Sequence, residues 1–261
     1  MQTSKQQGFT LIELIITITV ISLLMAGTLM YISNSVTAYV ATARRDQLTS
    51  LGRISVEKVT RELRSALPNS LRVSNNCLEF FPTLGGSAYL TLPVDSPASS
   101  FTAAAFSLVG STTNASVVVY PYNTSALYAA ANPGPLAGYS SQAGSPTATV
   151  TLSASHQFSH QAPQRRFYVV GTPVSYCIVG SDLMRYNSYG IHAAQVAPPT
   201  TGSSSLVAQN LQTSDGATTV TPFRYTPGTL RRSGVVTLDF RFLIDGEWIR
   251  LSHEVHVQNV L

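Results

Sequence analysis

The chain has 261 residues, of which 44% are apolar and only 11% are charged, and its formal net charge is +4. This length allows one or two domains with a sizeable core. Low charge with ample apolar content excludes a charge-rich disordered chain, and so small a net charge excludes a dense basic surface for nucleic acid. Two cysteines exclude a disulfide-dense scaffold and a four-cysteine zinc site.

Charged residues are missing from two segments of different character. The segment from Leu14 to Ala43 holds thirty residues without Asp, Glu, Lys or Arg and begins with the apolar run LIITITVISLLMAGTLMYIS. The segment from Ser96 to Gln164 holds sixty-nine such residues and is rich in Ser, Thr, Ala, Gly, Tyr and Asn. We expect the first to be a lipid-facing helix and the second to be uncharged strands and loops of an extracytoplasmic domain.

The first segment is long enough to cross a membrane. Leu14 to Ile32 is a run of nineteen uncharged residues, which as a helix spans roughly 28 Å, close to the ~30 Å hydrocarbon core of a bilayer. It follows a polar leader, residues 1–8, whose only charge is Lys5. Because Lys5 favours a cytoplasmic N-terminus, the chain after residue 33 is expected to lie outside the cytoplasm.

Glu13 stands at the head of this apolar run and bears on how the run is interpreted. A cleaved secretory signal is disfavoured because the run exceeds the usual apolar region of about 7–15 residues. A plain membrane anchor is the second interpretation. Both leave Glu13 unexplained, since a carboxylate within such a run costs about 2.5–3.5 kcal/mol and no Lys or Arg lies within the next thirty residues.

A third interpretation accounts for both the leader and Glu13. The segment Gly8-Phe9-Thr10-Leu11-Ile12-Glu13-Leu14 resembles the processing site of type IV pilins and type II secretion pseudopilins. The resemblance implies cleavage between Gly8 and Phe9 by a prepilin peptidase and N-methylation of the new Phe9 amine. It also implies that Glu13 acts in subunit assembly by pairing with the terminal amine of a neighbouring subunit. The chemistry agrees, because a carboxylate in a low-dielectric environment needs a cation.

The helix is expected to continue beyond the membrane. The first proline is Pro68, so residues 9–67 can form one helix of roughly 88 Å, with residues 9–32 as the transmembrane and fibre-core part. Gly27 and Gly52 are possible bends. Apolar residues at three- and four-residue steps predict a stripe that packs on the following domain. These residues are Leu48, Leu51, Ile54 or Ser55, Val59, Leu63 and Leu67.

Residues 68–261 have the pattern of a β-rich globular domain. Residues 77–82 and 87–93 flank Thr83-Leu84-Gly85-Gly86 and predict a hairpin with a glycine turn. Further strands are expected at 116–122, 148–155, 165–171, 173–179 and 183–190, and loops at 198–205 and over much of 95–115 and 129–147. The fold class is therefore α+β, a long N-terminal helix packed on a C-terminal domain of antiparallel sheet.

The C-terminal hairpin is the best-defined unit of this domain. Asp245-Gly246 is a strong signal for a two-residue type I′ turn. Pairing about it sets Ile244 opposite Glu247, Phe242 opposite Ile249, Phe240 opposite Leu251, Leu238 opposite His253, and Val236 opposite Val255. One face is then almost entirely apolar, which determines the register, and we expect that face to lie under the long helix.

Cys77 and Cys177 lie one hundred residues apart in apolar, strand-like contexts. In an exported domain an even pair of cysteines favours a disulfide, although two separate buried thiols would also fit. A disulfide closing a loop of this length contributes about 4–5 kcal/mol in the entropic model.

The sequence contains no recognisable catalytic constellation, so we expect no enzymatic activity, no cofactor and no metal. G-x-S-x-G, H-E-x-x-H and a phosphate-binding glycine loop are all absent. His156 and His160 have a spacing that suits a metal only on a helix, and their context is strand and loop. Basic residues between Arg44 and Arg72 are interpreted as a solvated helix face with subunit contacts, since no aromatic residues stand among them to stack nucleic-acid bases.

Further segments resemble the larger minor pilins, which include the J-type pseudopilins, the PilW-like pilins and minor pilins of the mannose-sensitive haemagglutinin (MSHA) pilus. The segments are SALPNSLRV, CLEFFPT, PVSYCIVGSDLMRY and EWIRLSHEVHVQNV. This resemblance implies assembly of a pilus, in a small complex at its tip that initiates the fibre. Two alternatives are a J-type pseudopilin of a type II secretion system and a tip adhesin that binds glycans through tyrosines such as Tyr120 and Tyr122.

The resemblance also implies partners and a location. The partners are the prepilin peptidase, other minor and major pilins and the inner membrane, and no nucleic acid is expected. Before assembly the protein would be a single-pass inner-membrane protein with its C-terminal domain in the periplasm. After assembly it would lie in the fibre or at its tip at the cell surface.

Overall fold

The structure is a computed structural model that describes residues 8–214, 216, 219–228 and 232–257. The expected leader, residues 1–8, lies outside the described residues apart from Gly8. The chain divides into two compact units, Met1–Gln47 and Leu48–Leu261. The fold is α+β, with a long N-terminal helix followed by antiparallel sheets, as the sequence predicts.

The helix α1 extends without interruption from Leu11 to Leu63, slightly shorter than the expected 9–67. Gly27 and Gly52 lie inside it and do not break it. It ends because the following residues pair with another segment: the Ser65 carbonyl accepts from Thr83 N–H at 2.8 Å, and Leu67 N–H donates to the Phe81 carbonyl at 2.8 Å. Sheet pairing therefore replaces the last helical turn that the apolar spacing predicts.

The buried stripe of α1 in the second unit contains smaller residues than expected. It consists of Leu48, Gly52, Ser55, Val59, Thr60 and Leu63. Ile54 is 63% exposed, so Ser55 is the buried member of the pair that the sequence left open, and Gly52 takes the place expected for Leu51. The absence of a side chain at Gly52 lets the C-terminal hairpin approach the helix closely.

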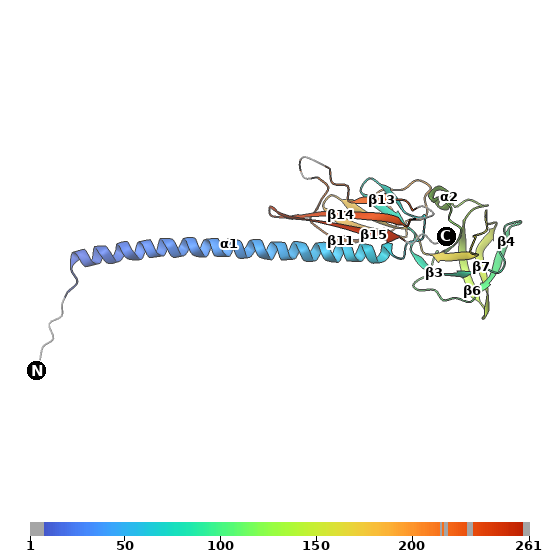
Figure 1. The fold of residues 1–261 in the computed structure, drawn as a ribbon, viewed down its shortest axis with the longest axis horizontal. Coiled ribbons are helices and arrows are strands. Elements are labelled where there is room, and N and C mark those ends of the chain that lie inside the picture. The colour runs from blue at the N-terminus through green and yellow to red at the C-terminus, as the bar shows by residue number, and fades with distance from the viewer. Residues whose placement is uncertain (1–7, 215, 217–218, 229–231, 258–261) are drawn as a thin grey trace, which may run out of the picture. The chain divides into compact units, whose positions relative to one another are not determined.

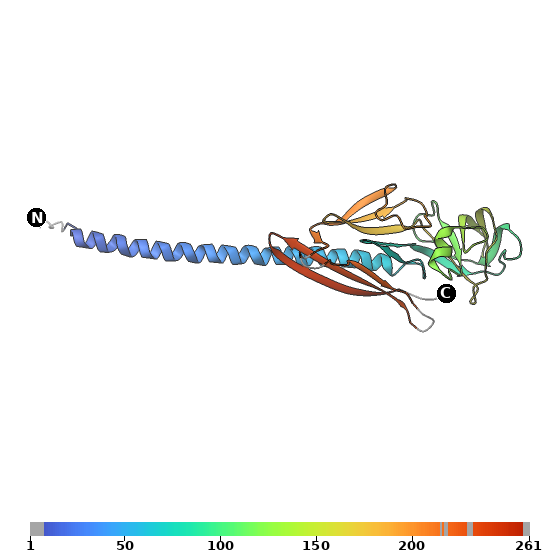
Figure 2. The same ribbon diagram turned by 90° about the horizontal axis from the view of Figure 1, so that it is seen from above.

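Two sheets surround the second half of α1, and all their strand pairs are antiparallel. The five-stranded sheet has the order β1 (Arg72–Ser74), β2 (Cys77–Phe80), β9 (Val174–Val179), β10 (Asp182–Asn187) and β11 (Ser203–Ala208). In the other sheet, β14 (Gly234–Ile244) pairs with β12 (Leu211–Gln212), β13 (Phe223–Thr226) and β15 (Glu247–Val257). Figures 1 and 2 both show β14 and β15 side by side along the second half of the helix.

A six-stranded antiparallel sheet is the third sheet of this unit, and four of its strands lie in the charge-free segment 96–164. Its order is β3 (Thr83–Ala88), β8 (Arg166–Val170), β5 (Ser116–Val119), β6 (Leu136–Ala143), β7 (Thr147–His156) and β4 (Ala98–Ala104). The short helix α2 (Thr124–Ala129) begins after Asn123, whose side chain accepts a hydrogen bond from the N–H of Ala126. The green and yellow strands of Figure 1 show this sheet.

The predicted hairpin of residues 77–93 is wrong. β2 and β3 belong to different sheets, and β3 pairs with β8. Residues 83–86, expected as a turn, lie inside β3 because their glycines serve close packing: a Cβ at Gly85 would lie 2.7 Å from the Ser107 carbonyl oxygen, and one at Gly86 would overlap the Phe167 carbonyl. The glycines therefore mark close backbone approach within a sheet.

Several segments expected as loops also form strands. β4 lies within 95–115, β6 within 129–147, and β11 overlaps 198–205. Their residues are mostly Ser, Ala and Gly, which have little strand propensity of their own. Pairing with neighbouring strands stabilises them, and such tertiary context outweighs local preference in sheets.

The C-terminal hairpin is confirmed with the predicted register throughout. Asp245 and Gly246 both have positive φ, 47° and 87°, as a type I′ turn requires. Arg241 and Arg250 face each other across the strands. Their repulsion is relieved because Arg250 Nε donates to Asp239 Oδ1 at 2.8 Å and the Arg241 guanidinium lies 4.7 Å from the ring centre of Trp248.

Buried side chains of the described residues form three clusters. The largest joins the second half of α1 to the five-stranded sheet and to β14 and β15, with Phe80, Tyr176 and Phe240 fully buried. A second lies within the six-stranded sheet, around Phe101, Phe158 and Phe167. The third, which includes Leu67, Phe81 and Tyr128, follows the end of α1 and contacts β5 and α2.

Gly52 provides a test of the packing between α1 and the hairpin. A Cβ at Gly52 would overlap Leu251 Cδ1 and lie 3.3 Å from Phe242 Cε2. We expect Gly52→Val to lower the free energy of unfolding by about 1–3 kcal/mol, measured by urea unfolding of the detergent-solubilised chain. Leu251→Ala should make room, so the double variant should lose less than the sum of the single variants. The exposed Ser50→Val is the control, and an equal loss there would contradict this explanation.

Candidate functional site

The expected processing site lies in the open at the start of the described chain. Gly8, Phe9 and Thr10 precede α1 and are not helical. Phe9 is 80% exposed, and nothing lies within 4 Å of a Cβ placed at Gly8. The peptide bond between Gly8 and Phe9 is therefore outside regular structure and sterically accessible, which are the conditions that a peptidase requires of its substrate.

Glu13 lies in the first turn of α1. Thr10 caps this end, its Oγ1 accepting a hydrogen bond from the Glu13 N–H at 3.4 Å. A helix N-terminus carries partial positive charge and free N–H groups, so it favours an acidic side chain. Among the described residues, the Glu13 carboxylate has no hydrogen-bond or ion-pair partner.

The first half of α1 is apolar and uncovered. It is long and apolar enough to cross a membrane, and none of that stretch is buried within the chain. Its hydroxyl groups are satisfied internally, because each donates to a backbone carbonyl three or four residues earlier at 2.7–3.0 Å. The residues concerned are Thr17, Thr19, Ser22 and Thr28.

This arrangement leaves two chemical requirements at the N-terminus. The apolar surface needs lipid or other apolar helices around it. The Glu13 carboxylate, at the head of that surface, needs a cation there, since an unpaired charge in low dielectric is costly. The segment is thus suited to lipid or to contact with other apolar helices.

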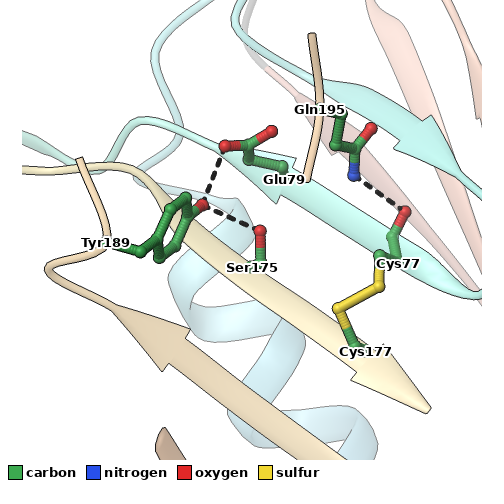
Figure 3. Close-up of a disulfide and its surroundings, with 6 residues drawn as sticks. All are labelled: Cys77, Glu79, Ser175, Cys177, Tyr189 and Gln195. Carbon is green, nitrogen blue, oxygen red and sulfur yellow. Dashed lines mark hydrogen bonds between the residues drawn. A yellow bond between two sulfur atoms is a disulfide. The ribbon is translucent and has the colours of Figure 1, made fainter. Parts of the chain in front are cut away.

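In the second unit, Cys77 and Cys177 form a disulfide between β2 and β9 (Figure 3). The two residues are register partners in adjacent strands, and both are buried. Gln195 Nε2 donates to the Cys77 carbonyl at 3.2 Å. The bond therefore joins two central strands of the five-stranded sheet.

A buried carboxylate lies two residues from this disulfide along β2. Glu79 is fully buried and accepts a hydrogen bond from the Tyr189 hydroxyl at 2.8 Å. That hydroxyl also lies 2.8 Å from Ser175 Oγ, and Figure 3 shows the three side chains converging from β2, β9 and the loop after β10. Burial is the main cause of a raised pKa for Tyr189, and the negative charge of Glu79 raises this pKa further. The phenol of Tyr189 therefore stays neutral and can donate a hydrogen bond to the carboxylate.

Arg72 provides the counter-charge to Glu79. Its Nε pairs with Glu79 Oε2, while Nη1 and Nη2 donate to the carbonyls of Ala193 and His192 at 2.7 and 2.8 Å. Its guanidinium carbon lies 3.5 Å from the ring centre of Tyr128, a cation–π contact. The pKa of Tyr128 is raised, mainly by burial, so this phenol also stays neutral. Each charge is thus compensated, as a buried polar network requires.

This network was not predicted from the sequence. The sequence predicts a solvated helix face for Arg72, whereas it is a strand residue that neutralises a buried carboxylate. Glu79 lies in a segment that the sequence predicts only as an apolar strand. A single charge within CLEFF, seven residues after an arginine, is the signal that could have indicated a cross-strand pair.

The two histidines with four-residue spacing have separate surroundings. His156 is buried, with Nε2 3.0 Å from the Gly134 carbonyl oxygen. His160 instead stacks edge-on with Tyr122, their ring centres 4.9 Å apart. No group of metal-ligating side chains occurs within the described part of the chain.

The Arg72–Glu79 pair provides a second test. Arg72→Ala leaves a buried carboxylate without a counter-charge and should lower the free energy of unfolding by about 3–5 kcal/mol. Arg72→Met with Glu79→Leu should lose less than Arg72→Ala alone. Urea unfolding with the disulfide intact measures both. The Arg250–Asp239 pair supplies the control: its arginine is 60% exposed, and Arg250→Ala, which also removes the facing of Arg241 and Arg250, should cost about 1 kcal/mol or less. A double variant as unstable as the sum of its single changes would contradict the coupling.

Comparison with known protein families matches residues 3–29 to the prokaryotic N-terminal methylation motif. The match includes Gly8, Phe9 and Glu13 and the start of the apolar helix. No curated protein and no solved structure matches the chain. With an accessible Gly8–Phe9 bond and an apolar helix headed by Glu13, the chain carries the N-terminal methylation motif of a type IV pilin-like protein.

Proposed function

We propose that this chain is a minor pilin of a type IV pilus of the MSHA kind, similar to the minor pilin MshO, and that it acts in pilus assembly within a tip or initiation complex. The observation that carries the proposal is the methylation motif, with Gly8, Phe9 and Glu13 in place at the head of an uncovered apolar helix. The protein is a substrate of processing and a structural subunit, without catalytic activity of its own.

The first proposed step is maturation at the inner membrane. A prepilin peptidase on the cytoplasmic face cleaves after Gly8, removes the leader of residues 1–8 and exposes the Phe9 amine, which is then N-methylated. The methylated amine remains a cation. Residues 9–32, most of which belong to the long helix α1, anchor the chain in the membrane, while residues 68–261 lie in the periplasm.

The second proposed step is entry into the fibre. Glu13 of one subunit pairs with the terminal amine of a neighbouring subunit as their apolar helices come together. In the low dielectric between helices this attraction is much stronger than in water. It also favours one axial offset between subunits, because other offsets leave both charges unpaired.

The MSHA assignment is supported by the segments that resemble minor pilins. Residues 65–73 and 77–83 carry Arg72, Cys77 and Glu79, and residues 173–186 carry Cys177. The same residues form the disulfide and the buried ion pair. The resemblance therefore includes residues that stabilise this fold. The partners of the chain in this proposal are other minor and major pilins.

Processing can be tested at Gly8. Gly8→Val adds a branched side chain at the cleaved bond and should leave the full precursor, measured by mass spectrometry of membrane fractions. The wild type should have the precursor mass less residues 1–8, plus one methyl group. Gly27→Ala is the matched control, since nothing lies within 4 Å of a Cβ there, and it should be processed normally. A Gly8→Val protein of mature mass would refute the cleavage site.

Assembly can be tested at Glu13. Glu13→Val removes the charge but keeps the apolar helix, so processing should be normal while the protein is lost from sheared pili by about tenfold or more. Immunoblots of membrane and pilus fractions measure this distribution. Thr17→Val, which removes an internally bonded hydroxyl one turn later, should behave as wild type. Normal recovery of Glu13→Val in pili would count against the amine-pairing role.

A further inference from the structure

Strand β15 is an edge strand among the described strands. Among the described strands it pairs with β14 alone, while β14 pairs with β12 and β13 along its other edge. β15 runs from Glu247 to Val257, eleven residues. An uncovered edge of this length presents a row of backbone donors and acceptors that can pair with another strand.

The hairpin register shows which backbone groups face outward. In a two-residue hairpin the residues flanking the turn, Ile244 and Glu247, form a hydrogen-bonded pair, and such pairs alternate along the strands. Consistently, the intervening β14 residues Asp239 and Leu243 donate away from β15, each at 2.9 Å. The corresponding β15 residues face the free edge, and all are exposed. They are Trp248, Arg250, Ser252, Glu254 and His256.

A groove runs beside this strand, between β15 and the part of α1 that belongs to the same unit. Its volume is about 590 Å³, and Val56 and Leu251 contribute apolar surface to it. Thr60 also lines it; this residue is 6% exposed, and its Oγ1 is buried with no hydrogen-bond partner among the described residues. The groove therefore offers apolar contact beside a buried hydroxyl.

The rim of the groove is basic. Arg53, Arg61 and Arg64 line it, and each is exposed with no ion-pair partner among the described residues. Glu57 is the single carboxylate among the described residues that line the groove. His253, from β15, also lines the groove. The groove is thus lined by three guanidinium groups and one carboxylate. This excess of positive charge favours an acidic binding partner, because guanidinium–carboxylate hydrogen bonds are strong and directional.

We propose that the groove and the β15 edge together bind an extended acidic segment of a partner protein, which adds to the sheet as a further strand. A strand is the element that can satisfy the outward backbone groups of β15. Alternate side chains of the added strand point into the groove, where aliphatic ones contact Val56 and Leu251 and carboxylates reach the arginine rim. The occupant thus carries both kinds of side chain on one face.

A second copy of this chain does not meet that description. Acidic residues on one face of a strand stand two or four positions apart. In this sequence only Asp245 and Glu247 have such a spacing, and they lie at the turn between β14 and β15. The partner is therefore a different protein, and the inference does not depend on the proposed function as a pilin.

The test uses the full chain in detergent micelles and a fluorescent nine-residue peptide. Threonine occupies every second position of the peptide, and glutamate and valine alternate at the others. A matched peptide has lysine in place of glutamate. By fluorescence anisotropy, the glutamate peptide should bind at least about tenfold more tightly than the lysine peptide, and its binding should weaken with salt.

Two sets of variants separate the edge from the rim. Ser252→Pro removes an outward N–H that the hairpin itself does not use, so it should weaken binding about tenfold or more while the fold persists. Ser252→Ala keeps that N–H and should bind as wild type. Arg61→Ala with Arg64→Ala should also weaken binding about tenfold and reduce its salt dependence.

A measurement on the wild type covers the case in which Ser252→Pro fails to fold. Peptide binding should slow hydrogen exchange at the amides of Arg250, Ser252 and Glu254, and it should change the fluorescence of Trp248, the only tryptophan of the chain. Unchanged exchange at these amides, or equal binding of the two peptides, would overturn the proposal. So would self-association through this edge without peptide binding.

Discussion

The close contact between α1 and the C-terminal hairpin determines much of the second unit. Gly52 leaves room on the helix for Phe242, Ile249 and Leu251 to approach it. The hairpin in turn sets the position of β12 and β13, which pair with the far edge of β14. A bulky residue at Gly52 would separate the helix from the sheet, and the largest core cluster would lose its continuity.

The two units distribute polar groups in opposite ways. In the second unit, burial of Glu79 is accompanied by Arg72, Tyr189 and Ser175, so the charge is compensated within the chain. At the N-terminus, Glu13 heads an apolar helix and has no such partner among the described residues. A compensated charge stabilises one fold, whereas an uncompensated one creates a requirement that another molecule must meet.

Local signals made part of this structure predictable. The Asp245-Gly246 turn and strict alternation specified the hairpin register, and the N-terminal motif indicated Gly8, Phe9 and Glu13 as a group. In the six-stranded sheet, β5, β7 and β8 lie at segments that the sequence predicts as strands. β4 and β6 do not, because they consist mostly of Ser, Thr, Ala and Gly and their pairing depends on distant partners. The Arg72–Glu79 pair was missed because it arises from cross-strand contact that neither residue indicates alone.

The disulfide between β2 and β9 has a consequence for the architecture as a whole. All six strands of the six-stranded sheet, from β3 to β8, lie in the chain between Cys77 and Cys177. The chain leaves the five-stranded sheet after Phe80 and returns at Val174, and these two residues are register partners. The sheet is therefore an insertion whose two ends meet at one place, clamped by a covalent bond. An insertion anchored in this way can change in length and surface without altering the order of the strands around the helix.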